Sequence, residues 1–261
     1  MRFFKISKLV MCAMCIALVA SVLSSCKNKV DANEACDKAF FYEDDENYEE
    51  AAKWYKMAAE QGHAGAQNNL GAYYADGKGV PQSDTTAVKW LKLAAEQGYA
   101  EAQYNLGLFY ADGRGVPQSI TAAVRLWRLA AEQGYANAQY NLGICYMQGQ
   151  GVQQSYEEAL RWYKKAAEQD DAVAPMAQTN VAAFYFNGYG VAKDYYEAVR
   201  WYKKAAEQGV AQAQYTLGYC YQHGLGTEFD YTEATKWYRK AAEQGHAEAM
   251  QAIERLNSLY N

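Results

Sequence analysis

One sequence pattern returns along the chain at a nearly fixed interval. The string Ala-Ala-Glu-Gln places its glutamate at positions 60, 96, 132, 168, 207 and 243, so the interval is 36 residues except for one of 39. A Gly-x-Gly pair keeps the same intervals and begins at positions 77, 113, 149, 188 and 224. The longer interval reflects a three-residue insertion around residues 170–175. A period of this length predicts stacked units that contact only their neighbours, without one central core.

Each unit is predicted to contain two helices. In the second helix of the fourth unit, Ala159, Trp162, Tyr163 and Ala166 are spaced i, i+3, i+4 and i+7, while charged residues occupy the opposite side. The Trp-Tyr pairs of this stripe are predicted to be core residues, at positions 54/55, 162/163, 201/202 and 237/238. The third unit departs from this order because it carries Leu-Trp at 126/127.

Residues that start and stop helices recur with the same period. The position before each second helix holds a side chain that can accept a bond from a free backbone N–H group: Asn47, Ser83, Ser119, Ser155, Asp194 and Asp230. A glutamate three residues later predicts a capping box in four copies: Glu50, Glu158, Glu197 and Glu233. A glycine then ends the helix in five copies: Gly62, Gly98, Gly134, Gly209 and Gly245.

These motifs resemble the Sel-1-like repeat, a subfamily of the tetratricopeptide solenoids. The residues that carry the resemblance are Ala-x-x-Trp-Tyr-x-x-Ala-Ala-Glu-Gln-Gly, Ala-Gln-Tyr-Asn-Leu-Gly-x-x-Tyr and Gly-x-Gly-Val. The resemblance implies an all-α fold, an α/α right-handed superhelical solenoid of stacked helix pairs with a concave groove. It also implies a non-enzymatic scaffold that binds a protein or peptide in that groove.

The expected organisation has five parts. Residues 1–25 are predicted to be a lipoprotein signal peptide, and residues 26–32 a short tether. A divergent helix pair is expected at 33–62, five Sel-1-like repeats at 63–245, and a capping helix at 246–261.

The first 25 residues have the character of an export signal. Arg2, Lys5 and Lys8 precede an apolar stretch at 9–23, which is too short as a helix for a hydrocarbon core of about 30 Å. Leu-Ser-Ser-Cys then ends at Cys26 and resembles the bacterial lipobox, which implies that Cys26 carries the lipid anchor. The expected location is the bacterial envelope, at the outer membrane rather than the inner one, facing the periplasm or the surface. Ordinary cleavage near Ser25 with release of the protein is the alternative.

Composition speaks against several other functions. The net charge is −5, which disfavours binding to nucleic-acid phosphates. Three histidines, at 63, 223 and 246, offer little material for a metal site or a histidine-based triad. No catalytic residue, metal ligand or cofactor is predicted.

The remaining cysteines bear on a rival function. Cys145 and Cys220 occupy the same repeat position two units apart, too far for a disulfide, so buried thiols are expected there. Some Sel-1-like proteins carry a cysteine pair in every unit and have been described as weak β-lactamases. This chain lacks that pairing, which counts against a β-lactam-binding hydrolase.

The candidate binding residues lie on the first helix of each unit, opposite its core stripe. This far face is apolar in the inner units and polar at the corresponding positions of the closing helix, 248, 251, 255 and 258. The candidate contacts are Tyr104, Tyr140, Ile144, Phe186, Tyr215 and Tyr219. Tyrosine suits such a surface because it joins a large apolar ring to a polar tip. Packing against the neighbouring repeat is the alternative for each of them, since a buried stripe has the same pattern.

Three functional hypotheses remain open. The first is a monomeric, lipid-anchored scaffold in a Gram-negative envelope with an unknown protein or peptide partner. The second is a β-lactam-binding hydrolase, and the third is a secreted effector that binds a host protein.

Overall fold

The computed structural model describes residues 30–259, with side chains to residue 257, and all regular structure in this range is helical. The predicted signal peptide and Cys26 lie outside the described residues. The chain divides into two compact units, at Ser83. The first contains α2 (Ala32–Asp44), α3 (Tyr48–Glu60) and α4 (Ala64–Asp76).

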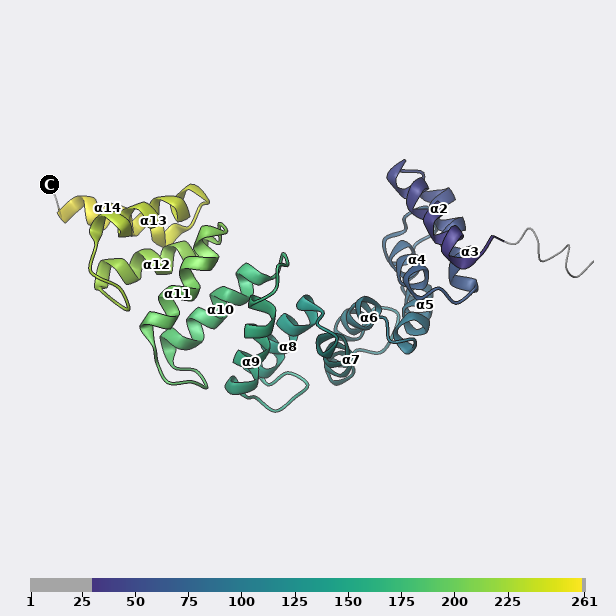
Figure 1. The fold of residues 1–261 in the computed structure, drawn as a ribbon, viewed down its shortest axis with the longest axis horizontal. Helices are drawn as coiled ribbons and strands as arrows, with labels where there is room; N and C mark the ends of the chain where they lie inside the picture. The colour runs from purple at the N-terminus through teal and green to yellow at the C-terminus, as the bar shows by residue number, and fades with distance from the viewer. Residues whose placement is uncertain (1–29, 260–261) are drawn as a thin grey trace, which may run out of the picture. The chain divides into compact units, whose positions relative to one another are not determined.

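The second unit contains ten described helices (Figure 1). They are α5 (Asp84–Glu96), α6 (Ala100–Asp112), α7 (Ile120–Glu132), α8 (Ala136–Gln148), α9 (Tyr156–Ala167), α10 (Ala174–Asn187), α11 (Tyr195–Glu207), α12 (Ala211–His223), α13 (Tyr231–Glu243) and α14 (Ala247–Leu259). Inside each unit, every helix packs against the helices next to it in the sequence. The predicted all-α architecture of stacked helix pairs is confirmed.

The second helices begin where the sequence predicts. The Ser155 hydroxyl accepts a bond from the Glu158 backbone N–H at 3.2 Å, and the Asp194 carboxylate accepts one from Glu197 at 3.0 Å. Asn47, Ser119 and Asp230 cap their helices in the same way. The five terminal glycines all have positive φ, as predicted: Gly62, Gly98, Gly134, Gly209 and Gly245.

The predicted capping boxes are only half correct. The cap residue's own N–H donates to the carbonyl of a first-helix tyrosine, as Ser155 does to Tyr146 at 2.9 Å. Because this N–H is already bonded, the glutamate is free to pair with a basic residue three positions later. Glu158 pairs with Arg161 at 3.1 Å. The glutamates of the other three predicted boxes form the same kind of ion pair: Glu50–Lys53, Glu197–Arg200 and Glu233–Lys236.

The second glycine of each Gly-x-Gly pair packs against the preceding repeat. Gly190 has φ +61°, and a Cβ placed there would lie 2.6 Å from the backbone carbon of Tyr156, at the start of α9. No residue with a side chain fits this contact without backbone movement. The motif therefore both ends α10 and sets the distance between adjacent repeats.

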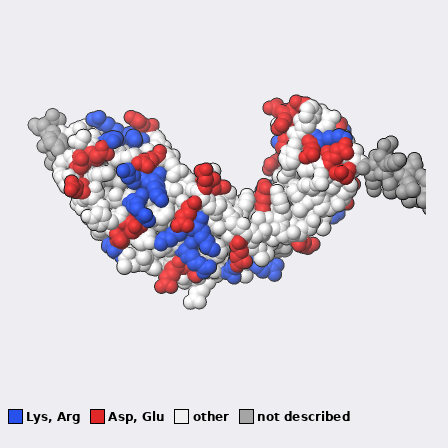
Figure 2. All heavy atoms as spheres, in the orientation of Figure 1, with Lys and Arg blue, Asp and Glu red and all other residues white. Residues whose placement is uncertain are grey.

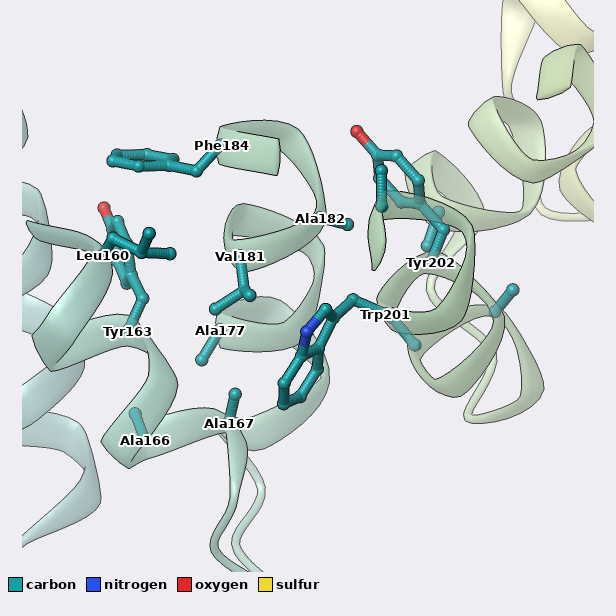
Figure 3. Packing of buried hydrophobic residues seen from close by; sticks show 14 of the residues in the cluster. Leu160, Tyr163, Ala166, Ala167, Ala177, Val181, Ala182, Phe184, Trp201 and Tyr202 are labelled. Carbon is teal, nitrogen blue, oxygen red and sulfur yellow. The ribbon is translucent and has the colours of Figure 1, made fainter. Parts of the chain in front are cut away.

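Most of the predicted Trp-Tyr core is confirmed. Trp201 and Tyr202 of α11 are buried, and Figure 3 shows Trp201 lying against α10 beside Ala167 and Ala177. Trp54 is the exception, because it is only half-buried. The Lys38 ammonium lies 4.7 Å from the centroid of the Trp54 ring.

A ladder of glutamines links successive repeats, each buried one on a first helix bonding a more exposed one at the end of a second helix. Gln178 donates to the Ala167 carbonyl at 3.1 Å and accepts a bond from Gln208 at 2.8 Å. The same link joins Gln133 to Gln103, Gln169 to Gln139, and Gln244 to Gln214. Buried amides are costly unless bonded, so this ladder explains why the first helices α6, α8, α10 and α12 each keep a glutamine at this position.

The described cysteines are buried free thiols, as predicted for Cys145 and Cys220, and Cys36 joins them. Burial raises the pKa of Cys145 to about 11 and that of Cys220 to about 12. Among the described helices, none is both long and apolar enough to cross a membrane.

Candidate protein-binding site on the first helices

The first helices of the second unit present little charge. Helices α8 and α10 contain no charged residue, whereas α9 and α11 contain five each. Figure 2 shows Lys and Arg side chains gathered over α9, α11 and α13. Charged side chains therefore mark the second helices as solvated surface, while the first helices offer apolar and amide groups.

We use the name first-helix face for the six predicted contacts, and the structure places them on four helices. Tyr104 lies on α6, Tyr140 and Ile144 on α8, Phe186 on α10, and Tyr215 and Tyr219 on α12. Five are half-buried, and Tyr219 is 37% exposed. The six are spread along the stack, and Tyr215 and Tyr219 share a cavity.

Tyr104 packs across a repeat boundary. Its ring centroid lies 5.1 Å from that of Tyr135, the residue before α8. Burial raises the pKa of Tyr104, and the nearby side chain of Asn141 on α8 partly opposes this shift. Tyr104 thus contributes to packing between repeats as well as to the surface.

Tyr140 and Phe186 pack within their own repeats. The Tyr140 ring lies 5.6 Å from the buried ring of Tyr163, and the Phe186 ring lies 5.0 Å from Tyr195 in an edge-to-face arrangement. Ile144 also packs on the edge of the buried cluster that contains Tyr163. These three side chains pack on the core, and each also keeps part of its surface exposed. The geometry is therefore compatible with a packing role and with contact to a partner.

Tyr215 and Tyr219 form the best-defined part of the first-helix face. They line a cavity of about 210 Å³ between α12, α13 and α14, together with Gln222, His223 and Arg255 among others. The Tyr219 ring lies 4.3 Å from the His223 ring, and the Tyr215 ring stacks on His246 at 4.8 Å. The cavity combines aromatic walls with a guanidinium, an amide and an imidazole.

Sequence reasoning missed the polar lining of this cavity. Arg255 belongs to the closing helix, and the sequence predicts only that its position is polar. His223 is the last residue of α12. The helical spacing places Tyr215, Tyr219, Gln222 and His223 on one side of α12, which is a signal that the sequence does contain. The approach of Arg255 depends on how α14 packs, which spacing along one helix does not encode.

Comparison with known proteins identifies the family. The Sel1 repeat model matches residues 38–63, 64–99, 100–135, 136–171, 175–210 and 211–246. A solved Sel1 repeat protein from Oxalobacter formigenes is 37% identical, with a TM-score of 0.78 over 83% of this chain and 88% of that one. No curated protein matches the chain.

A second solved structure is c5321, described as a protective antigen with an SLR fold in uropathogenic Escherichia coli strains. It is 32% identical, with a TM-score of 0.60, and the match covers 90% of this chain and 58% of that one. The described helices form a tetratricopeptide-like solenoid of the same kind. The chain belongs to the Sel1 repeat family, whose members are generally scaffolds for protein–protein interaction.

Proposed function

We propose that this protein is a non-enzymatic scaffold that holds a protein or peptide partner on its first-helix face. The observation that supports this proposal most is the cavity lined by Tyr215 and Tyr219, two of the predicted contacts, together with the Arg255 guanidinium. Aromatic rings supply apolar contact area with polar tips, and arginine and tyrosine are both frequent in the residues that dominate binding energy. The preferred ligand is an extended peptide with an apolar side chain and a carboxylate.

We further propose that the protein works while anchored to the envelope. The support is the lipobox-like Leu-Ser-Ser-Cys, in which Cys26 would carry the acyl chains. Two or more chains give stable anchoring where one is marginal. The outer membrane of a Gram-negative cell is the proposed location, with the repeats facing the periplasm or the surface and the protein present as a monomer.

Lipidation is tested by the Cys26→Ser variant. Acyl labelling should disappear, and the protein should leave the membrane fraction, because the thiol that carries the lipid is gone. Intact-mass measurement of the wild-type protein should give a mature chain that starts at Cys26 with the added acyl mass. A mature N-terminus at another residue would refute the anchor and favour the secreted effector.

Binding is tested by the Tyr219→Ala variant, because Tyr219 is the most exposed residue of the first-helix face. A partner captured by crosslinking in intact envelopes should bind the purified variant about 5- to 30-fold more weakly, as expected for the loss of one interfacial aromatic worth about 1–2 kcal/mol. Tyr196→Ala is the matched control, since Tyr196 is 78% exposed on the second helix α11. Equal affinity of the Tyr219 variant and the wild type would exclude this face. Hydrolysis of a β-lactam by the purified protein would favour the hydrolase instead.

A further inference from the structure

Helix α7 departs from α9, α11 and α13 at three positions on one side, and the loss of the tryptophan also sets it apart from α5. The tryptophan shared by α9, α11 and α13 is replaced by Leu126. Where α9 carries Glu158 and Lys165, α7 carries Ala122 and Leu129. One large aromatic and two charged side chains are thus exchanged for smaller or apolar ones on the same surface.

In the other repeats, the tryptophan fills a defined space. Trp162 belongs to the buried cluster of Ala131 from the preceding second helix and Leu142 from its own first helix. Trp201 occupies the same place one repeat later, against Ala167 and Val181 (Figure 3). The indole is therefore the group that closes the space between a first helix and two successive second helices.

The corresponding space beside α7 is open. A cavity of about 450 Å³ lies between α5, α6 and α7, with Ala95, Leu106, Tyr110, Leu126 and Leu129 in its lining. Ala95 and Leu106 are the equivalents, 36 residues earlier, of the Ala131 and Leu142 that surround Trp162. We call this cavity the α5–α7 pocket. Its volume falls within the range of about 300–1,000 Å³ usual for ligand sites.

The rim of the α5–α7 pocket carries a cation without the ion pair that its equivalents in α9, α11 and α13 make. Arg161, Arg200 and Lys236 each pair with a glutamate three residues earlier, at 3.1, 2.8 and 2.9 Å. Arg125 has Ala122 at that position, and it forms no ion pair with any side chain in the described part of the chain. Lys92 adds a second positive charge to the lining and Glu96 one negative charge. Leu129, 45% exposed, extends the apolar wall to the surface.

We propose that the α5–α7 pocket receives an aromatic side chain, best an indole, from an extended segment of a partner protein, and that a neighbouring carboxylate on this segment pairs with Arg125. The pocket offers the walls that hold an indole elsewhere in this chain. The positive charges of Arg125 and Lys92 can attract the aromatic ring of the partner through cation–π contacts. They can also attract its carboxylate through charge-assisted hydrogen bonds. No residue of the first-helix face lines this pocket, so it is a second and separate contact region.

The test uses the full chain, purified in detergent, and two capped tripeptides that carry 5-fluorotryptophan. Asp-Trp-Asp is the matching probe and Ala-Trp-Ala is the neutral one, and binding is followed by fluorine NMR. The wild type should bind Asp-Trp-Asp more tightly than Ala-Trp-Ala. Leu126→Trp should weaken both by about tenfold or more, because the protein's own indole then fills the pocket as Trp162 does.

A second variant separates the charge from the cavity. Ala122→Glu supplies the ion pair that the equivalents of Arg125 in α9, α11 and α13 make, so the affinity for Asp-Trp-Asp should fall about threefold more than that for Ala-Trp-Ala. If Leu126→Trp fails to fold by circular dichroism, Leu129→Lys replaces it. It introduces the exposed lysine that α9, α11 and α13 carry and should weaken the neutral Ala-Trp-Ala by removing part of the apolar wall.

Three results would overturn the proposal. One is that the wild-type protein shifts the fluorine signal of neither probe at millimolar concentration. Another is unchanged binding of Ala-Trp-Ala by Leu126→Trp or, if that variant does not fold, by Leu129→Lys. The third is a wild-type dimer, seen by sedimentation, that Leu126→Trp dissociates, because a second copy would then occupy the pocket. Loss of binding at Tyr219 leaves this test unaffected, so the two sites fail or succeed separately.

Discussion

Cys220 illustrates how a single buried group controls the response to pH. Its side chain has no exposed surface, and burial raises the thiol pKa from 9.0 to about 12. A raised pKa in the folded state means that the contribution to stability is complete below pH 9 and is lost as the pH rises toward 12, because the unfolded thiol ionises first.

Cys220→Ala should therefore reduce the pH dependence of stability. Between pH 8 and pH 10, the wild type should lose about 1 kcal/mol more free energy of unfolding than the variant, since one pKa unit corresponds to about 1.4 kcal/mol. Urea unfolding at both pH values measures the difference. Buried tyrosines contribute equally to both proteins, so parallel losses in the two would show that burial does not raise the pKa of this thiol in the folded protein.

Single residues also mark the limit of sequence reasoning. The caps at Ser155 and Asp194 followed from local chemistry and were predicted correctly, since the bond stays within one helix turn. The second half of the capping box was wrong, because the Ser155 N–H finds the Tyr146 carbonyl nine residues earlier. A partner supplied by another helix is not visible in a local motif.

At the scale of helices and their connections, the two kinds of glycine have different tasks. Gly190 and Gly209 both have positive φ, but a Cβ at Gly190 would strike the start of α9, whereas nothing lies within 4 Å of one at Gly209. Gly209→Ala should cost about 1–2 kcal/mol from backbone strain alone. Gly190→Ala should cost about 3 kcal/mol or more, because adjacent repeats must also separate. Chemical denaturation of the two variants compares these costs, and equal values would show that Gly-x-Gly acts only as a helix stop.

The closing helix is predicted to protect the last full repeat. Ala249, Ala252 and Leu256 of α14 are buried in the same cluster as Tyr238 and Ala241 of α13, while Glu248 and Gln251 face solvent. Deletion of residues 247–261 should lower stability by at least about 2 kcal/mol, because Leu256 is lost and the Tyr238 ring is uncovered.

Light scattering and thermal unfolding of the deletion variant measure this effect, and we expect a protein that aggregates at lower temperature. Deletion of residues 258–261 alone is the control, since it leaves Leu256 in place. Identical melting and sedimentation of the long deletion and the full chain would show that α14 is no cap.

Over the whole molecule, the repeat period made the fold predictable. Each interval of 36 residues repeats the same caps, stops and core stripe, so helix pairs and their order follow directly. The glutamine ladder was not predicted, because Gln178 and Gln208 lie 30 residues apart and meet only when repeats stack. The candidate site was predicted as six positions on the first helices, and whether they bind a partner stays a prediction. The cavity of Tyr215 and Tyr219 also depends on Arg255, whose position follows from the packing of α14.

Site-specific photocrosslinking in living cells tests the central claim, that the first-helix face holds a protein partner. Benzoylphenylalanine is placed at Tyr219 and, as a control, at Tyr196, which is more exposed but lies on a second helix. The expected result is a discrete adduct at position 219 that is weak or missing at position 196. Adducts of the same size and strength at both positions, or none at position 219, would contradict the claim.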